Sequence, residues 1–162
     1  MTVCKFIRKL LDLKGLLVSD FQLKLRDRQL NLWVKPYKNG CLCPHCKRRR
    51  KIVRTMNKPR IWRDIPICGW SVFLWYCPRE VFCPIHDRVQ EDIPWASPYS
   101  HITYRFEYSL FIYCQLMTQK AAAKLLHIPQ STLSGLLHRS ITRLRSEHKI
   151  RGLKSIGIDE IS

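Results

Sequence analysis

The sequence has few acidic residues and no long apolar run. It contains 12 aspartates and glutamates against 29 lysines and arginines, which gives a formal charge of +17 at pH 7. Residues 65–76 form the best apolar run, but it holds Pro66 and Gly69 and is shorter than the roughly 20 residues that span a bilayer. Asp12 and Lys14 interrupt the apolar core that a signal peptide needs. We therefore expect a cytoplasmic protein without a membrane partner.

The chain is also small. Its 162 residues suit one ordinary domain or two small ones and are too few for a large enzyme with a deep cleft. Hydrophobic residues make up 46% of the chain, which is enough to build a folded core and to exclude wholesale disorder. The eight cysteines are expected to be reduced thiols or metal ligands, because disulfides are rare in the cytosol.

The positive charge is concentrated in residues 41–64, which hold nine basic residues and one acidic residue. The densest block consists of Lys47, Arg48, Arg49, Arg50 and Lys51. Such an imbalance favours a polyanionic partner, because each phosphate contact releases counterions. We predict that this block contacts the phosphates of double-stranded DNA. The alternative is a solvated basic face that only keeps the chain soluble.

Hydrophobic periodicity predicts a β-rich first half and a helical second half. Apolar and polar residues alternate over residues 21–34 around a polar turn at 26–29, which indicates a hairpin. Residues 49–83 also alternate, and turn signals divide them into short strands. After a proline-rich stretch at 92–98 the apolar spacing becomes helical. The expected helices lie near residues 106–117, 121–126 and 133–148.

Two short motifs have the spacing of a metal site. Cys43 and Cys46 form a C-x2-C knuckle, and Cys83 and His86 form a C-x2-H knuckle further along the chain. Zinc takes four such ligands in a tetrahedron, and two tight turns provide them without a large core. Metal binding would then stabilise a small β-ribbon. We predict a structural zinc ion, because tight knuckles leave no open coordination position for catalysis.

The residues allow other ligand choices. Cys41 and Cys77 are close enough in the sequence to replace a ligand, with Cys77 the first substitute for His86, and His45 lies inside the first knuckle. The alternative to a metal site is a set of buried thiols with a surface histidine. The remaining cysteines are expected in the core: Cys4, Cys68 and Cys114.

Residues 118–137 have the spacing of a helix-turn-helix. Ala123 is small enough for the close crossing of two helices, and His127, Ile128 and Pro129 form the turn between them. His127 stands where this turn often has glycine, and histidine tolerates a positive φ better than most residues. Ile128 is expected to be buried between the helices. The spacing is equally compatible with an ordinary helical hairpin, but the net charge and the zinc knuckles favour DNA binding.

The second helix of this motif would enter the major groove. Its outward polar positions are candidate base readers, because glutamine, serine and threonine hydrogen-bond base edges. These positions are Gln130, Ser131, Thr132, Ser134 and Gly135. His138 and Arg139 lie further along the helix and are expected nearer to phosphate.

The predicted fold class is α+β, with a small zinc-stapled β-ribbon domain followed by an α-helical helix-turn-helix domain. Most of Trp33, Trp70 and Trp95 are expected in the core, and the alternative is that they are exposed and serve a protein partner. The expected segments are an N-terminal β-hairpin region (1–40), a zinc-binding β-ribbon (41–91), a linker (92–98), a helix-turn-helix domain (99–150) and a last strand (151–162).

Together these motifs resemble the ISL3 family of bacterial insertion-sequence transposases, from about residue 20 to the end of the chain. The motifs follow the family's order and spacing: CPHC at 43–46, IWRDIP at 61–66, FCPIH at 82–86, PW at 94–95, YRFE at 104–107, the helix-turn-helix at 121–137 and IGIDE at 156–160. The resemblance implies an N-terminal zinc-binding domain, a helix-turn-helix and then a DDE catalytic domain.

Two features depart from the family's pattern. The second knuckle is usually C-x2-C, whereas His86 takes the last position here, and zinc accepts either. The sequence also ends at Ser162, soon after Asp159, which by resemblance matches the first carboxylate of the catalytic triad. That chemistry needs several carboxylates to hold two Mg²⁺ ions. Asp159 is therefore expected to be inactive alone, residues 151–162 to be the first strand of a truncated catalytic domain, and Mg²⁺ to serve only a full-length form.

We therefore expect a DNA-binding chain that is not an enzyme as it stands. It would recognise the terminal inverted repeats of an insertion sequence and be associated with the bacterial nucleoid. A homodimer, or association with full-length transposase, is expected among its partners. The alternatives are a transcription regulator, a zinc-stapled interaction module, and a transposase whose catalytic site is completed by another chain.

Overall fold

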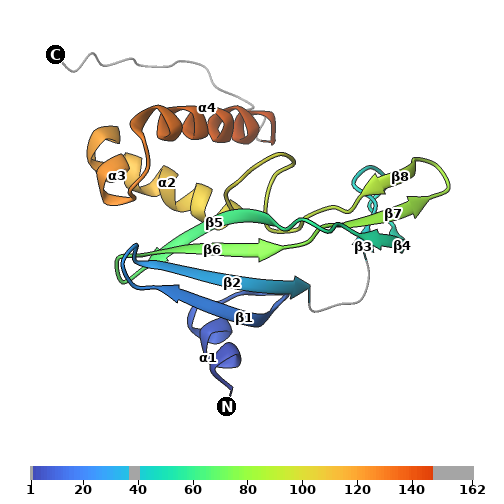
Figure 1. Cartoon of the computed structure of the whole chain (residues 1–162). Helices are drawn as coiled ribbons and strands as arrows, with labels where there is room; N and C mark the ends of the chain where they lie inside the picture. Colours follow the sequence, from blue (N-terminus) through green and yellow to red (C-terminus); the bar gives the residue numbers. More distant parts are fainter. Residues whose placement is uncertain (1, 37–40, 148–162) are drawn as a thin grey trace, which may run out of the picture. The chain divides into compact units, whose positions relative to one another are not determined.

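The computed structural model describes residues 2–36 and 41–147, and it confirms a mixed fold with strands in the first part and helices in the second (Figure 1). The chain divides into two compact units inside one helix, between Ser109 and Leu110. The sequence had placed this division in the linker at 92–98. None of the helices in the described part of the chain has the length and apolar character needed to cross a membrane.

The larger sheet contains β1 (Leu16–Lys24), β2 (Gln29–Pro36), β6 (Trp70–Tyr76) and β5 (Arg60–Ile67), in that order. The β1–β2 and β5–β6 pairs are antiparallel, as the turn signals predict, and β2 lies parallel to β6. The first hairpin turn places Arg28 at a φ of 47°. The expected hairpin is therefore present, and two later strands extend it.

One face of this sheet carries the main core. Side chains at alternate positions of β2 and β6 are buried there, including Leu32 and Leu74, at 0% and 1% exposure. The helix α1 (Val3–Leu10) lies next to β1 in Figure 1 and contributes Ile7 to the cluster. Burying each such leucine stabilises the fold by about 1.5–3 kcal/mol.

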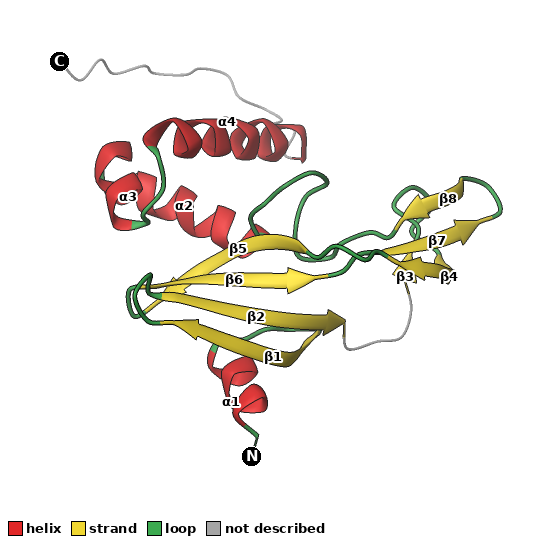
Figure 2. Cartoon of the chain, viewed as in Figure 1, coloured by secondary structure: helices red, strands yellow, loops and turns green. Residues whose placement is uncertain are grey.

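The smaller sheet contains β3 (Cys41–Leu42), β4 (Arg49–Thr55), β7 (Arg79–Cys83) and β8 (Asp87–Gln90), joined in this order as antiparallel pairs (Figure 2). Every side chain of β4 except that of Arg50 is exposed. The sheet therefore has almost no apolar core, because few of its alternate side chains meet a second layer.

The structure distributes residues 41–91 over both sheets, which differs from the expected single ribbon. Strands β5 and β6 leave the ribbon and pair with the N-terminal hairpin, because β6 buries its own apolar face beside β2. Residues 92–98 also differ from an exposed linker. Ala96 is buried in the main core, and Trp95 packs edge-on against Trp62 and Tyr76, with centroid distances of 5.8 and 5.3 Å.

The expectation of a buried Cys68 is wrong. Cys68 is exposed in the β5–β6 turn, where its φ is 48° and Gly69 follows at 75°. A two-residue turn with both φ values positive matches the twist of a hairpin, and this geometry points the side chain away from the core. Cys4 and Cys114 are half-buried.

A buried ion pair fixes the beginning of α2 (Tyr104–Leu116) to the larger sheet. Asp64 on β5 is completely buried, and its carboxylate accepts hydrogen bonds from the Thr103 hydroxyl at 2.7 Å and from Arg105 Nε at 2.7 Å. Arg105 also donates to the carbonyl oxygen of Leu11, just after α1. A carboxylate is tolerated in this position because it is fully paired.

The second unit consists of the rest of α2, α3 (Gln119–Leu125) and α4 (Gln130–Glu147). Its apolar side chains recur at helical spacing, and seven of them are each less than 8% exposed. They are Leu110, Ala122, Ala123, Leu126, Leu133, Leu136 and Leu137. The three expected helices are thus present in the second half of the chain.

Candidate metal centre and nucleic-acid interface

The structure brings Cys43, Cys46, Cys83 and His86 together, with their four donor atoms all within 4.8 Å of one another. The first two lie in the turn between β3 and β4, and the other two in the turn between β7 and β8. Each turn is closed by a backbone hydrogen bond and is followed by a residue with positive φ, which is Lys47 (54°) in the first and Asp87 (58°) in the second.

The spacing of these donors fits a tetrahedral zinc ion. Zinc–sulfur and zinc–nitrogen bonds of about 2.3 and 2.0–2.1 Å place tetrahedral ligands about 3.8 Å apart for two sulfurs and about 3.6 Å apart for sulfur and nitrogen. Cys46 Sγ and Cys83 Sγ are 3.8 Å apart, and His86 Nδ1 lies 3.5 Å from the sulfurs of both Cys43 and Cys83. Three of the six donor pairs therefore already have the spacing of a tetrahedral site, and all four donors lie close enough to share one metal ion.

Local hydrogen bonds favour the thiolate form that binds metals. Burial raises the pKa of Cys83, but the Ile85 backbone N–H and His86 outweigh it and lower that pKa to about 5. The backbone N–H of Arg48 lowers the pKa of Cys46. Thiolates are the metal-binding form of cysteine, so the lowered pKa values of Cys46 and Cys83 favour metal binding.

The two alternative cysteines are not part of this cluster. Cys41 is buried and forms a hydrogen bond with the Glu91 side chain. Burial and this hydrogen bond raise the pKa of Cys41 to about 12, which favours the neutral thiol. Cys77 is half-buried at the end of β6. Among the cysteines and histidines of the described residues, the cluster therefore contains only the four from the two knuckles.

Two members of the basic block are engaged by the ribbon itself. Lys47 Nζ forms an ion pair with Asp92 at 2.7 Å, and Arg50 Nη2 donates to Cys46 Sγ at 3.5 Å. Sequence reasoning missed this role of Arg50, although its position on β4, four residues after Cys46, was the available signal. Arg48, Arg49 and Lys51 are exposed.

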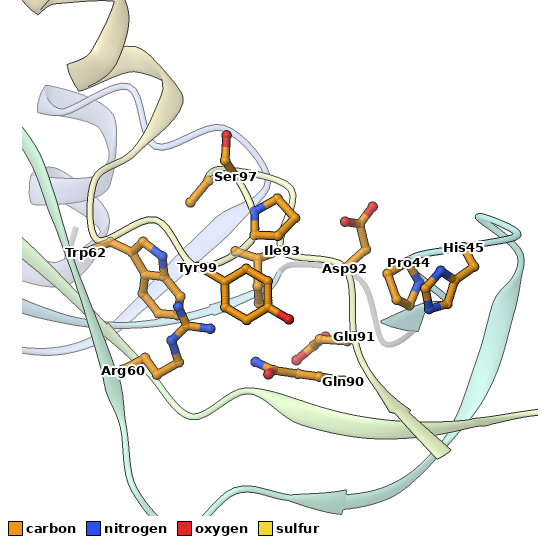
Figure 3. Close-up of a pocket in the computed structure, with 12 residues that line it drawn as sticks. Pro44, His45, Arg60, Trp62, Gln90, Glu91, Asp92, Ile93, Ser97 and Tyr99 are labelled. Carbon is orange, nitrogen blue, oxygen red and sulfur yellow. The ribbon is translucent and has the colours of Figure 1, made fainter. Parts of the chain in front are cut away.

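A cavity of about 310 Å³ lies beside the first knuckle (Figure 3). None of the four clustered residues lines it, so the cavity gives no access to a metal bound by them. Both carboxylates in its wall are already paired, Glu91 with Arg79 at 2.9 Å and Asp92 with Lys47. The wall also includes His45, Arg60, Trp62 and Tyr99.

Helices α3 and α4 are joined by a tight turn in the second unit. Thr118 caps α3 by accepting a hydrogen bond from the Ala121 N–H at 3.3 Å, and His127 adopts the expected positive φ, 51°. The Ile128 N–H donates to the Ala123 carbonyl at 3.0 Å, which closes the turn. Ile128 is half-buried rather than fully buried as expected.

The first turns of α4 present a polar, exposed face. Leu133, Leu136 and Leu137 face the core, so the residues between them point outward. All of the predicted contact residues on this helix are exposed: Gln130, Ser131, Thr132, Ser134, His138 and Arg139.

Sequence reasoning missed Gln119, the first residue of α3. Its Oε1 atom accepts a hydrogen bond from the Ser134 hydroxyl at 2.9 Å, and the same hydroxyl lies 3.1 Å from the Gln130 carbonyl. Gln119 therefore fixes the side chain of a candidate base reader. A polar residue directly after the N-cap of the first helix was the available signal.

Asp159 and the strand expected at 151–162 lie outside the described residues. The role that the resemblance implies for the Asp159 carboxylate therefore stays a prediction.

Residues 91–141 match the model of the helix-turn-helix domain of transposase family ISL3. Two relatives, each a transposase for insertion sequence element IS1557, come from Mycobacterium tuberculosis strains CDC 1551 / Oshkosh and ATCC 25618 / H37Rv. Each is 28% identical over 122 residues, which cover 74% of this chain and 27% of the relative. The chain thus spans about a quarter of the length of these relatives. No solved structure matches it.

Proposed function

We propose that this chain is a DNA-binding module that recognises the terminal inverted repeats of an insertion sequence. The proposal starts from the match of its residues 91–141 to the helix-turn-helix domain of ISL3-family transposases. The exposed polar face of α4 carries this proposal, because α4 follows α3 and the tight turn and begins within the matched residues 91–141. Gln130, Ser131, Thr132 and Ser134 read base edges, while His138 and Arg139 contact phosphate or guanine. The chain's own residues bind DNA and do not cut it.

The ribbon has a separate role in this proposal. Cys43, Cys46, Cys83 and His86 hold a structural zinc ion, which fixes the β3–β4 and β7–β8 turns. The exposed cations Arg48, Arg49 and Lys51 then contact phosphates and add a sequence-independent, salt-dependent part to the affinity. Lys47 and Arg50 contribute less to DNA binding, because Asp92 and Cys46 already engage them.

Fluorescence anisotropy tests the proposal. Zinc-loaded protein is titrated with the duplex that flanks its own gene and with a scrambled duplex, at two salt concentrations. Preference for the flanking duplex that persists at the higher salt is the expected result. Gln130→Ala should reduce this preference about tenfold, because one good base contact contributes about 1–3 kcal/mol of discrimination.

Two matched variants separate base reading from general effects. Gln115→Ala removes another exposed helical glutamine of the second unit and should leave the preference unchanged. Arg49→Gln should weaken binding to both duplexes equally and reduce the salt slope by about one phosphate contact. Equal affinity of the unmodified protein for both duplexes would refute recognition by α4, and selective binding to a site away from any inverted repeat would indicate a transcription regulator.

A further inference from the structure

The face of the larger sheet opposite the main core carries a cavity of about 590 Å³. Its floor includes Trp33 on β2 and Trp75 on β6, whose rings stack with centroids 5.6 Å apart and an interplanar angle of 22°. The two residues are direct neighbours in the parallel β2–β6 register. Both rings are half-exposed, which differs from the core position expected for Trp33.

The tryptophan pair is held rigidly. Trp75 Nε1 donates to Asn31 Oδ1 at 2.9 Å, and the Asn31 side chain is only 2% exposed. The Ser19 hydroxyl donates to the Trp33 carbonyl at 3.1 Å, at the bulge of β1. Ligand binding would therefore cost little side-chain entropy, because hydrogen bonds already fix the indole N–H of Trp75 and the backbone carbonyl of Trp33.

The charge of the lining indicates the ligand class. Two lining residues are cationic, Lys35 and Arg79, and no lining residue is acidic. Arg79 is already paired with Glu91, so the charge argument rests on Lys35. Lys35 is exposed on β2, two residues after Trp33, so it points to the same face of the sheet. Flat aromatic rings beside a cation fit a nucleobase and its phosphate, whereas an apolar peptide would need no cation.

We propose that this groove binds unpaired nucleotides of DNA by stacking bases on Trp33 and Trp75, with Lys35 at the phosphate. The inference rests on the proposed function, because it takes DNA as the partner and adds a second binding mode for single-stranded DNA. The duplex is read by α4 in the other unit, and the sheet holds bases that have left the duplex. Stacking accepts any base, so this site carries no sequence preference.

The test uses the zinc-loaded 162-residue chain and a fluorescein-labelled 12-nucleotide oligo-dT, with the flanking duplex measured in parallel. Trp33→Leu keeps an apolar side chain but removes the stacking surface, and it should weaken oligo-dT binding about tenfold. Trp33→Phe restores a ring and should bind within about threefold of the unmodified chain. Lys35→Gln should reduce the salt slope for oligo-dT by about one. All variants should bind the duplex unchanged.

Trp70→Leu is the matched control, because Trp70 is a half-buried tryptophan at the start of β6, in the same sheet but outside the groove. Equal oligo-dT binding by Trp33→Leu and the unmodified chain would overturn the groove proposal and leave duplex recognition intact. Loss of duplex selectivity with Trp33-dependent oligo-dT binding retained would refute only the proposed function. A DNA-free dimer that dissociates in Trp33→Leu would overturn the proposal in favour of a second copy as occupant, which sedimentation velocity would detect.

Discussion

The two sheets of the first unit are stabilised in different ways. The β1-β2-β6-β5 sheet buries a continuous apolar cluster beneath α1, whereas the β3-β4-β7-β8 sheet buries little more than Val81 and three cysteines. The smaller sheet brings four donors of the right chemistry to one end instead. A sheet that lacks a second layer needs such a cross-link, because strand pairing alone is marginal in water.

The two sheets also meet at a polar junction. Glu91, which follows β8, accepts a hydrogen bond from the Tyr76 hydroxyl at 2.5 Å and forms a two-pronged ion pair with Arg79. Tyr76 belongs to the larger sheet and Arg79 to the smaller one. The unfolding of variants can show whether the two sheets unfold separately or together.

Metal removal should give the largest difference between the sheets. A structural zinc site contributes on the order of 10 kcal/mol to folding, which the small sheet cannot replace by apolar burial. With EDTA, or in Cys83→Ser, backbone amides of β4 and β7 should lose hydrogen-exchange protection while those of β2 and β6 keep it. Cys68→Ser alters an exposed thiol outside the cluster and should change neither protection nor zinc content. Loss of protection in both sheets would show a single cooperative unit.

Breaking the junction should have the next largest effect. Glu91→Gln leaves Arg79 without its anionic partner in a site where the Glu91 side chain is 4% exposed. Removing one member of a buried pair typically costs about 3–5 kcal/mol. Urea unfolding of the metal-loaded protein should show this decrease. Glu80→Gln, which alters a more exposed pair with Arg54, is the matched control and should cost below about 1 kcal/mol.

A pair of core truncations tests where apolar packing contributes. Leu32→Ala in the larger sheet should lower the free energy of unfolding by about 2–5 kcal/mol, because it leaves a cavity among buried side chains. Ile52→Ala in β4 should cost below about 1 kcal/mol, since Ile52 is already 38% exposed. Urea titration with zinc present measures both. Equal losses of unfolding free energy in the two variants would show that Ile52 is packed as tightly as Leu32 and that the small sheet also depends on apolar packing.

The smallest expected effect concerns surface charge on the ribbon. Arg54 Nε and Glu80 Oε2 are 2.6 Å apart, and the Arg54 side chain is 67% exposed. Exposed ion pairs contribute about 0–1 kcal/mol, so Arg54→Ala should barely change stability in either 50 mM or 500 mM salt. A thermal melt of the metal-loaded protein measures this. A loss that shrinks strongly at high salt would show that electrostatics, besides the metal, stabilises the small sheet.

Local spacing predicted the features of the site that depend on neighbouring residues. The interval between Cys43 and Cys46 and that between Cys83 and His86 each fit a tight turn, so the four donors could be named from the sequence. His127 could be placed at a positive φ because it lies between two helix-like patterns. The exposure of Cys68 was missed although Cys68 and Gly69 were recognised as a turn signal, because a turn between two apolar strands does not by itself indicate whether its side chains are buried.

The sequence by itself determined the charge, the two knuckles and the polar face of α4, because each arises from residues a few positions apart. Only the tertiary structure decided that β6 leaves the ribbon to pair with β2, since long-range strand pairing depends on which faces can be buried together. That one pairing places Trp33 beside Trp75 and separates the sheet that carries the Cys/His cluster from the apolar one. Residues 42 positions apart in the sequence carry no local signal that they will share a surface.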